Sequence, residues 1–514
     1  MERVIQTDIA VMGSGLAGLS AAYQIAKQTN LSVALFEKRP YQGGAVSNCP
    51  MAFMSIPDTP DHLEKALAVM GEFTNYAGDL GLARTVFQYS SRIPEIVLGE
   101  FGIEVESKIE NDFNTYGQKR AYGSGFPNGM DVGDYYFIKG RGKGHAAALV
   151  CLQYRRALEK MGVSLYFSTP IQKIIKDNGR VVGATAVDKN GEEITIKCKA
   201  LIVASGGISD NKELLKQELG VIRTDDNCSG DGEVVFLHFK NGKQTGDGQQ
   251  AIWDIGGAKG GFSVSGHSVV AGPGLIDNIA WMPKNMLRIL QEQPYLWVDD
   301  FGRRFMNEEM SDQHMAVGAG LYNNPRRCGY IIFDEDTIKR WAKRGVEEDY
   351  VYFIFRGAKI LYVREQMDSV TVQGNKNVCH ADTLHEVCEF MGIDEAGLRE
   401  TLERYNGYCE NGRDLEFGKN ARYLRPVREE SGHIYAMRIN LGGYNTIGGI
   451  RVDRKLRVLD ERKHPIPGLY SAGDMISASL YGDPPINASS SFTASVSSGF
   501  AAGDYAAEYV KEGI

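Results

Sequence analysis

The sequence lacks the patterns that mark membrane-spanning and nucleic-acid-binding proteins. It contains no run of about 18 apolar residues, so we predict no transmembrane helix. Its net charge of −8 gives no support to binding of nucleic acid or of an anionic membrane surface. No signal peptide precedes the first predicted strand, and no internal repeat is visible. With 43% hydrophobic and 24% charged residues, the composition predicts a soluble globular protein.

The eight cysteines are scattered, with no C-x-x-C pair and no C-x-x-C-H haem attachment site. This distribution is typical of free thiols in a reducing compartment, so we expect a cytoplasmic protein. Cysteines and histidines lie close together at Cys379-His380 and at His385 and Cys388. Because acidic and loop residues intervene without the spacing of a zinc finger, we predict no metal site.

A dinucleotide-binding pattern is present near the N-terminus. Residues 9–12 are apolar, as a strand buried on both faces requires, and Gly13, Gly15 and Gly18 follow with the spacing G-x-G-x-x-G. A predicted helix then leads to a second strand at residues 33–36, which ends in Glu37. The glycines permit a tight turn and a close approach of a pyrophosphate, and the acid is placed to bind a ribose. This motif alone does not distinguish NAD from FAD.

The rest of the chain favours a flavin protein of two or more domains, since 514 residues exceed one ordinary core. A second glycine loop at Gly43-Gly44 follows the ribose-binding acid, where an NAD domain would continue with strand–helix units. Residues 171–197 alternate like antiparallel hairpins, and residues 200–204 read as another buried strand. The sequence TGDG at residues 245–248 opens a further helix. Helices and mixed tracts then predict a separate α+β domain, followed by strands and a C-terminal helix at residues 491–511.

These stretches together resemble the fumarate reductase and 3-ketosteroid dehydrogenase superfamily of FAD oxidoreductases. The matching segments are GSGLAGLSAA, FEK followed by GG, DNGRVVGATA, KALIVASGG, TGDGQQAIWDIGGA, DDFGRRFMNEE, NTIGGIRVD and IPGLYSAGD, and they occur in the family's order. The resemblance implies an α/β fold, in which a Rossmann-like FAD-binding domain carries an inserted α+β capping domain. We place the FAD-binding domain at residues 1–262 and 438–514, and the capping domain at residues 263–437.

The resemblance also implies which residues hold FAD. No histidine lies near residues 43–49 to carry a covalent flavin, so we expect non-covalent FAD. The serines at the start of the last helix are placed near the flavin N1 and O2 edge, although helix capping also explains them. The implied set is Gly13, Ser14, Gly15, Ala17, Gly18, Glu37, Lys38, Gly43, Gly44, Ala45, Ser47, Ile171, Ala204, Ser205, Gly206, Asp247, Gly473, Asp474, Ser489, Ser490 and Ser491.

The dicarboxylate-binding cations of fumarate reductases have no counterpart in most of the matching segments. The proton-delivering arginine position falls near Asp312, Asn445 replaces a histidine, and the segment at Tyr481 reads YGDPP. A buried carboxylate substrate needs paired cations, so we predict that fumarate is not the substrate. A neutral, enone-like substrate is expected instead. Because the chain lacks a haem or FMN domain, the resemblance implies an external electron donor or acceptor.

The leading hypothesis is an FAD-dependent enzyme that acts on a C=C or CH–CH bond next to a carbonyl. Hydride passes through flavin N5, and a side chain delivers the proton. Tyr481 is the first candidate for this proton donor, and Tyr444, Tyr136, His267 and Asp312 are the second choices. Each of them also has a purely structural interpretation, and Glu308 is expected to pair with Arg304 or to cap a helix. The alternatives are oxidation like that of a 3-ketosteroid Δ1-dehydrogenase, and a non-catalytic FAD subunit of an electron-transfer complex.

Overall fold

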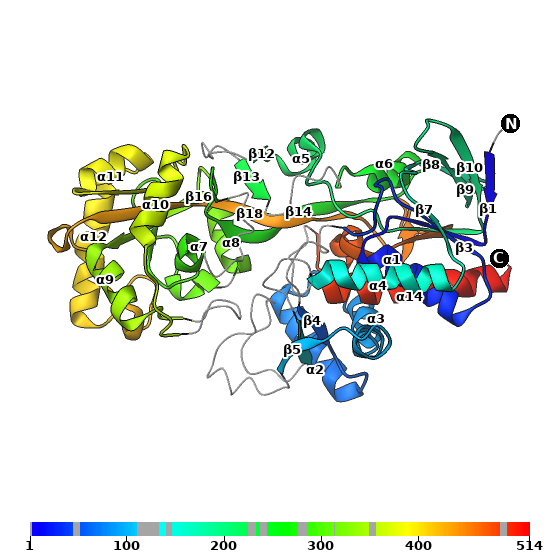
Figure 1. The fold of residues 1–514 in the computed structure, drawn as a ribbon, viewed down its shortest axis with the longest axis horizontal. Coiled ribbons are helices and arrows are strands. Elements are labelled where there is room, and N and C mark those ends of the chain that lie inside the picture. Colours follow the sequence, from blue (N-terminus) through cyan, green and yellow to red (C-terminus); the bar gives the residue numbers. More distant parts are fainter. Residues whose placement is uncertain are drawn as a thin grey trace. The chain divides into compact units, whose positions relative to one another are not determined.

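The protein forms two compact units in a computed structural model (Figure 1). The first unit comprises residues 1–219, 240–263 and 445–514, and the second comprises residues 220–239 and 264–444. The first unit is therefore assembled from both ends of the chain. The domain boundaries given above, at 262/263 and 437/438, stay a prediction. The structure describes residues 3–44, 52–109, 133–139, 146–224, 233–236, 244–275, 286–312, 314–348, 356–483 and 491–513.

A mainly parallel sheet forms the centre of the first unit. The predicted strand–turn–helix–strand is confirmed, because β2 (Ile9–Met12) and β3 (Val33–Phe36) pair in parallel and α1 (Leu16–Gln28) connects them. All residues of both strands are buried. The strand order is β19-β20-β11-β2-β3-β7, and only β19 at its edge is antiparallel. The other strands are β7 (Ser164–Tyr166), β11 (Ala200–Val203), β19 (Arg457–Leu459) and β20 (Pro465–Ser471).

The C-terminal helix α14 (Ser491–Glu512) packs against α1, so the two ends of the chain meet (Figure 1). Their backbones approach closely at Gly499, where a Cβ would lie 2.3 Å from the carbonyl oxygen of Ala17. A glycine is therefore required at this contact. The other helical segments described in this unit are α2 (Pro60–Phe73), α3 (Leu80–Ser90), η2 (Glu95–Glu100), α4 (Ala146–Lys160), α5 (Lys212–Leu219), α6 (Asp247–Asp254), η7 (Gly473–Ile476) and α13 (Ser477–Leu480).

Two smaller sheets complete the first unit. The predicted hairpins are confirmed: β8 (Ile171–Asp177), β9 (Arg180–Val187) and β10 (Glu193–Lys197) pair antiparallel. The turn between β8 and β9 contains Asn178 and Gly179, both with positive φ. The strand β1 (Arg3–Gln6) extends this sheet. The third sheet contains β4 (Ala52–Ser55), β6 (Asp134–Ile138) and β5 (Val105–Ile109) in that order.

The second unit has the predicted α+β character. Its sheet has the order β12-β13-β18-β16-β15, and β14 and β17 also pair with β18. The helices α11 (Leu384–Met391) and α12 (Glu395–Asn411) contribute to one buried core with β15 and β16. Both β14 (Lys259–Val269) and β18 (Ile434–Ile450) contain residues of the two units. The remaining strands are β12 (Ile222–Thr224), β13 (Glu233–Phe236), β15 (Leu296–Val298), β16 (Cys328–Asp334) and β17 (Val378–Ala381).

The remaining helical segments of the second unit lie along the chain between these strands. They are α7 (Met286–Gln291), η4 (Glu308–Asp312), α8 (His314–Asn323), α9 (Glu335–Arg344), α10 (Val363–Val372), η5 (Ala421–Tyr423) and η6 (Glu429–Ser431). In the described part of the chain, no helix of either unit combines the length and the apolar character that crossing a bilayer requires.

Candidate functional site

A pocket with an empty volume of about 810 Å³ opens at the carboxyl ends of β2, β3 and β11. Ligands of α/β sheets bind at this edge, where parallel strands end and their loops begin. All residues that line the pocket belong to the first unit. The pocket therefore combines segments from both ends of the chain.

Most of the residues predicted to hold the cofactor line this pocket. They are Gly13, Ser14, Gly15, Ala17, Glu37, Lys38, Gly43, Gly44, Ile171, Ala204, Ser205, Gly206, Asp247, Gly473 and Asp474. Gly18 does not line it and instead packs against the turn, where a Cβ would lie 1.9 Å from the Gly13 carbonyl oxygen. Ala45, Ser47, Ser489 and Ser490 lie outside the described residues, and Ser491 is described only as the first residue of α14. The assignment of these residues to FAD stays a prediction.

The N-terminus of α1 meets the requirements of a diphosphate site. Its N-cap residue is Gly15, no side chain caps it, and no acidic residue lies in its first turn. The free N–H groups and the positive end of the helix dipole therefore favour an anion. A Cβ at Gly15 would contact only the Gly44 Cα, at 3.8 Å, so glycine at this position leaves pocket space empty. Gly13 has a φ of +102°, which favours glycine at the turn.

Glu37 lies at the end of β3 and lines the pocket. One of its carboxylate oxygens, Oε2, accepts hydrogen bonds from the Ser14 N–H at 2.9 Å and the Ser14 hydroxyl at 2.6 Å. The other, Oε1, accepts from the backbone N–H of Arg39 at 2.9 Å and from its Nε at 3.3 Å. The Nη1 atom of Arg39 is buried without a partner. These four bonds use the roughly four acceptor sites of the carboxylate, so a ribose hydroxyl would have to replace or share one of them.

Asp474 also lines the cofactor pocket. It belongs to η7, the short helical segment that follows β20. It accepts a hydrogen bond from the side-chain amide of Asn445. Burial raises the pKa of Asp474 to about 7, and the hydrogen bond from Asn445 only partly opposes this shift. Asn445 is therefore engaged with an acid of the cofactor pocket.

A second, very small cavity of about 10 Å³ shares Gly473 and Asp474 with the cofactor pocket. Tyr481, the first candidate proton donor, lines this cavity and is buried. Its backbone N–H bonds to the Ser477 carbonyl and ends the short helix α13. None of the described residues that line this cavity carries a positive charge. Among the described residues, the lining of this small cavity thus includes a tyrosine and no cation.

The structure does not bring the other candidate donors into either cavity, as far as their side chains are described. Tyr136 lies on β6, its ring stacks on Phe53 with centroids 4.9 Å apart, and its hydroxyl donates to Asp134 at 3.4 Å. Tyr136 therefore has a packing role in this structure. Tyr444 lies on β18, His267 on β14, and Asp312 at the end of η4, and the side chains of these three lie outside the description.

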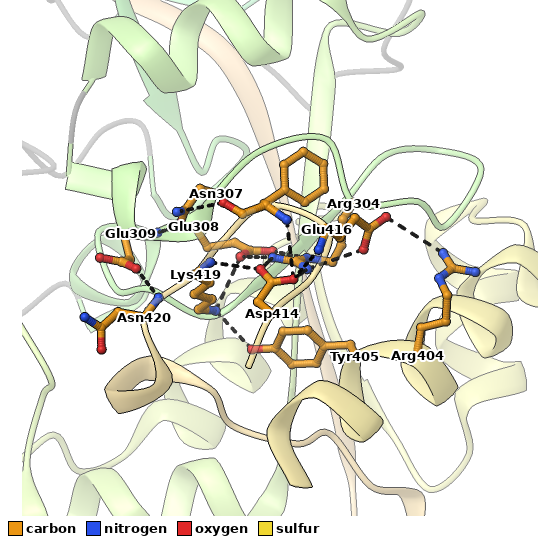
Figure 2. Close-up of polar contacts among 11 residues, drawn as sticks. Arg304, Asn307, Glu308, Glu309, Arg404, Tyr405, Asp414, Glu416, Lys419 and Asn420 are labelled. Atoms are coloured by element: carbon orange, nitrogen blue, oxygen red, sulfur yellow. Dashed lines mark hydrogen bonds and ion pairs between the residues drawn. The ribbon is translucent and has the colours of Figure 1, made fainter. Parts of the chain in front are cut away.

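The expected pairing of Glu308 with Arg304 is confirmed, and it belongs to a larger buried network (Figure 2). Arg304 donates two hydrogen bonds to Glu308, at 2.8 and 2.7 Å, and two to Asp414, at 3.0 and 2.9 Å. Lys419 contacts Glu308 at 3.4 Å and donates to the Tyr405 hydroxyl at 3.0 Å. Since two cations face two carboxylates, this cluster balances its own charge and holds η4 to the segment that follows α12.

Sequence reasoning missed several residues that line the cofactor pocket: Met12, Leu16, Phe36, Arg39, Pro170, Gln244, Ala472 and Ser495. Arg39 directly follows the predicted Glu37-Lys38 pair, and Gln244 directly precedes the TGDG segment. Their proximity to a motif was a usable signal. Ser495 lies about one helical turn after Ser491 on α14, so the helix period also pointed to it.

Comparison with known proteins places these features in context. Residues 8–489 match the family model described as "FAD binding domain". The vinyl phenol reductase of Lactiplantibacillus plantarum is 27% identical over 482 residues, which cover 93% of this chain and 91% of that protein. The urocanate reductase of Eggerthella lenta is 25% identical over 481 residues, which cover 91% and 69%.

A solved structure shows the same fold. The 3-ketosteroid Δ1-dehydrogenase from Sterolibacterium denitrificans, in complex with 1,4-androstadiene-3,17-dione, matches with a TM-score of 0.71 at 19% identity. The match covers 98% of this chain and 99% of that chain. The predicted fold class is therefore confirmed.

Proposed function

Because this chain belongs to the FAD binding domain family, we propose that it uses FAD to reduce the C=C bond of a neutral, enone-like substrate. The family and its relatives make the chain an FAD-dependent oxidoreductase of C=C or CH–CH bonds, as predicted. The neutral substrate, the direction of reaction and the proton donor are the proposed parts. Non-covalent attachment of FAD, an external electron donor and a cytoplasmic location stay predictions.

The observation that carries the proposal is the cavity beside the cofactor pocket. Tyr481 and Asp474 are among the residues that line it, and no described lining residue is cationic. A dicarboxylate in this cavity would meet no cation among the described lining residues, so its desolvation would cost several kcal/mol without compensation. The vinyl phenol reductase, a relative of similar length, is named for an unsaturated phenol without a carboxylate. Both observations support a neutral substrate.

In this proposal, residues of the chain bind the cofactor and supply the proton. When bound, FAD supplies the hydride chemistry. The α1 N-terminus holds the diphosphate, and Glu37 orients the ribose. Tyr481 holds the proton on its hydroxyl for delivery to the substrate carbon next to the carbonyl, a role that contributes roughly 10²- to 10⁴-fold to a rate.

An anaerobic experiment tests the substrate class. The purified protein is reduced with dithionite, and its reoxidation is followed by flavin absorbance after addition of a vinyl phenol, a cyclic enone, a steroid enone, urocanate or fumarate. We expect fast reoxidation by a neutral acceptor and none by fumarate. Fast reoxidation by fumarate or urocanate alone would show that the inference from the missing cations was wrong.

Substitution of Tyr481 tests the proton donor. Tyr481→Phe should lower the reoxidation rate with the active acceptor by about 100-fold or more, with unchanged FAD content. Tyr470→Phe is the matched control, because the Tyr470 hydroxyl is bonded to the Tyr505 carbonyl and lines neither cavity. Full turnover in the Tyr481 variant would remove this residue from the proton-donor role.

A further inference from the structure

Lys38, Thr245 and Asp247 form a closed set of polar contacts at the rim of the cofactor pocket. Lys38 follows Glu37 after β3, and Asp247 is the first residue of α6. The Lys38 ammonium donates to Asp247 Oδ2 at 2.8 Å and also to the Thr245 hydroxyl. The Thr245 hydroxyl in turn donates to Asp247 Oδ1 at 2.6 Å. Each polar group of the set thus has a partner within the set.

The set joins two separate walls of the pocket. Lys38, Gln244 and Asp247 all line the pocket, but Lys38 belongs to the segment after β3, whereas Gln244 precedes α6 and Asp247 begins it. The second wall is anchored independently of Lys38, because Asn211 donates to the Thr245 carbonyl at 2.9 Å and the Gln244 N–H donates to Asp210 at 3.0 Å. The Lys38–Asp247 ion pair is therefore a bridge between two fixed walls.

The bridge lies in a position where it contributes little to global stability. The side chains of Lys38 and Asp247 are 25% and 39% exposed, so water and salt screen their attraction. Opening such a pair is easy, but it widens the rim between the ribose-binding end of β3 and α6. The consequence should appear in the movement of a ligand through that rim.

We propose that the Lys38–Asp247 pair is a clasp that slows the dissociation of FAD, with Thr245 positioning both charges. The clasp acts on cofactor retention and requires no knowledge of the substrate, so it stands apart from the proposed reaction. In this arrangement Lys38 and Asp247 bind each other, and Asp247 retains FAD indirectly. The clasp closes the rim when the pair forms and opens it when the pair breaks.

If Lys38 contacted FAD itself, the Asp247→Asn variant would change FAD release in the opposite direction. If Lys38 binds the FAD diphosphate directly, Asp247 competes for the ammonium group, and Asp247→Asn would strengthen FAD binding. Removal of a negative charge near a diphosphate favours the anion by long-range electrostatics as well. The clasp instead requires that Asp247→Asn accelerates release. The direction of this single effect therefore separates the two arrangements.

The test measures FAD release from the holoprotein by the rise of flavin fluorescence after dilution. We expect Lys38→Gln and Asp247→Asn each to accelerate release by about 5-fold, and the double variant to be no faster than either. The wild-type rate should rise between 10 mM and 500 mM NaCl, and this dependence should be weak in the variants. Lys38→Arg, which keeps the charge, should stay near the wild-type rate, and Thr245→Val should fall between the two groups.

A matched control is present in the same unit. Lys199 pairs with Asp8 at 2.8 Å, and neither residue lines the cofactor pocket. Lys199→Gln changes the net charge as Lys38→Gln does, and it should leave FAD release unchanged. Slower release from Asp247→Asn, or equal release from all variants, would overturn the clasp.

Discussion

At the scale of single residues, Asp474 makes stability depend on pH in an unusual direction. Its pKa is raised by burial to about 7, above the value near 3.9 of an unfolded aspartate. A group with a raised folded-state pKa stabilises the fold fully below its unfolded pKa, and this contribution is lost as pH rises through the folded value. As pH rises from about 4 to about 7, Asp474 therefore lowers the free energy of unfolding of the FAD-free protein.

Asp474→Asn should abolish this loss while keeping an acceptor for Asn445. Urea unfolding of the FAD-free proteins at pH 4.5 and 7.5 measures it. The free energy of unfolding of the variant, relative to wild type, should increase by at least about 1 kcal/mol between the two pH values, the worth of one pKa unit. Asp8→Asn is a control: the hydrogen bond from Lys199 lowers the pKa of Asp8, so its contribution is lost only at more acidic pH and should change little between pH 4.5 and 7.5. Parallel pH profiles for wild type and Asp474→Asn would contradict the prediction.

The same scale shows what the sequence could reveal about the site. Gly13, Gly15 and Glu37 could be predicted from the sequence, because the strand, the turn and the ribose-binding acid follow one another along a short segment of the chain. Arg39 adjoins this motif, but only the folded pocket shows that its side chain reaches the same space. Asn445 was interpreted as a lost histidine, and its bond to Asp474 depends on a contact between separate elements.

At the scale of elements, the buried charge network holds η4 in place. Asp414 accepts from both terminal nitrogens of Arg304 and from the backbone N–H groups of Glu416 and Lys419. Burial would raise the pKa of Asp414, but these hydrogen bonds outweigh it and hold the pKa below its usual range. Removal of this one carboxylate leaves Glu308 as the one fully buried carboxylate that the described ion pairs place against Arg304 and Lys419, because Glu416 is partly exposed.

Asp414→Asn should therefore lower the free energy of unfolding by about 3–5 kcal/mol, as breaking one side of a buried ion pair does. Glu416→Gln is the matched control: its contact with Arg304 is 3.4 Å long and its side chain is 30% exposed, so the expected loss is below about 1 kcal/mol. Urea unfolding followed by tryptophan fluorescence measures both. Equal destabilisation by the two variants would show that the network does not depend on the buried carboxylate.

The elements differ in how well the sequence predicted them. The hairpins at residues 171–197 were predictable because Asn-Gly pairs define their turns. The strand β18 was not predicted at its full length, Ile434–Ile450, and the pattern indicated only residues 448–452. Glycines at positions 442, 443, 448 and 449 weaken the local preference for a strand. Pairing with β13, β16 and β17, which come from distant segments, overcomes this preference.

At the scale of the whole molecule, the cofactor pocket is a property of one unit. Every residue that lines it belongs to residues 1–219, 240–263 or 445–514. The strands that lead into and out of the long insertion run close together inside this unit: a Cβ at Gly448 would lie 2.1 Å from the Gly261 carbonyl oxygen. The chain could therefore be joined from Ser263 to Asn445 without displacing the pocket.

A protein in which short glycine-rich turns replace residues 220–239 and 264–444 should still bind FAD. We expect one FAD per chain, with a Kd within about tenfold of the full-length value, because no lining residue is lost. Gly18→Ala in the shortened protein is the control and should abolish binding, since its Cβ would lie 1.9 Å from the Gly13 carbonyl oxygen. Flavin absorbance after gel filtration measures both. A shortened protein that folds but takes up no FAD would show that the second unit contributes to the cofactor site, and the pocket described here would then be incomplete.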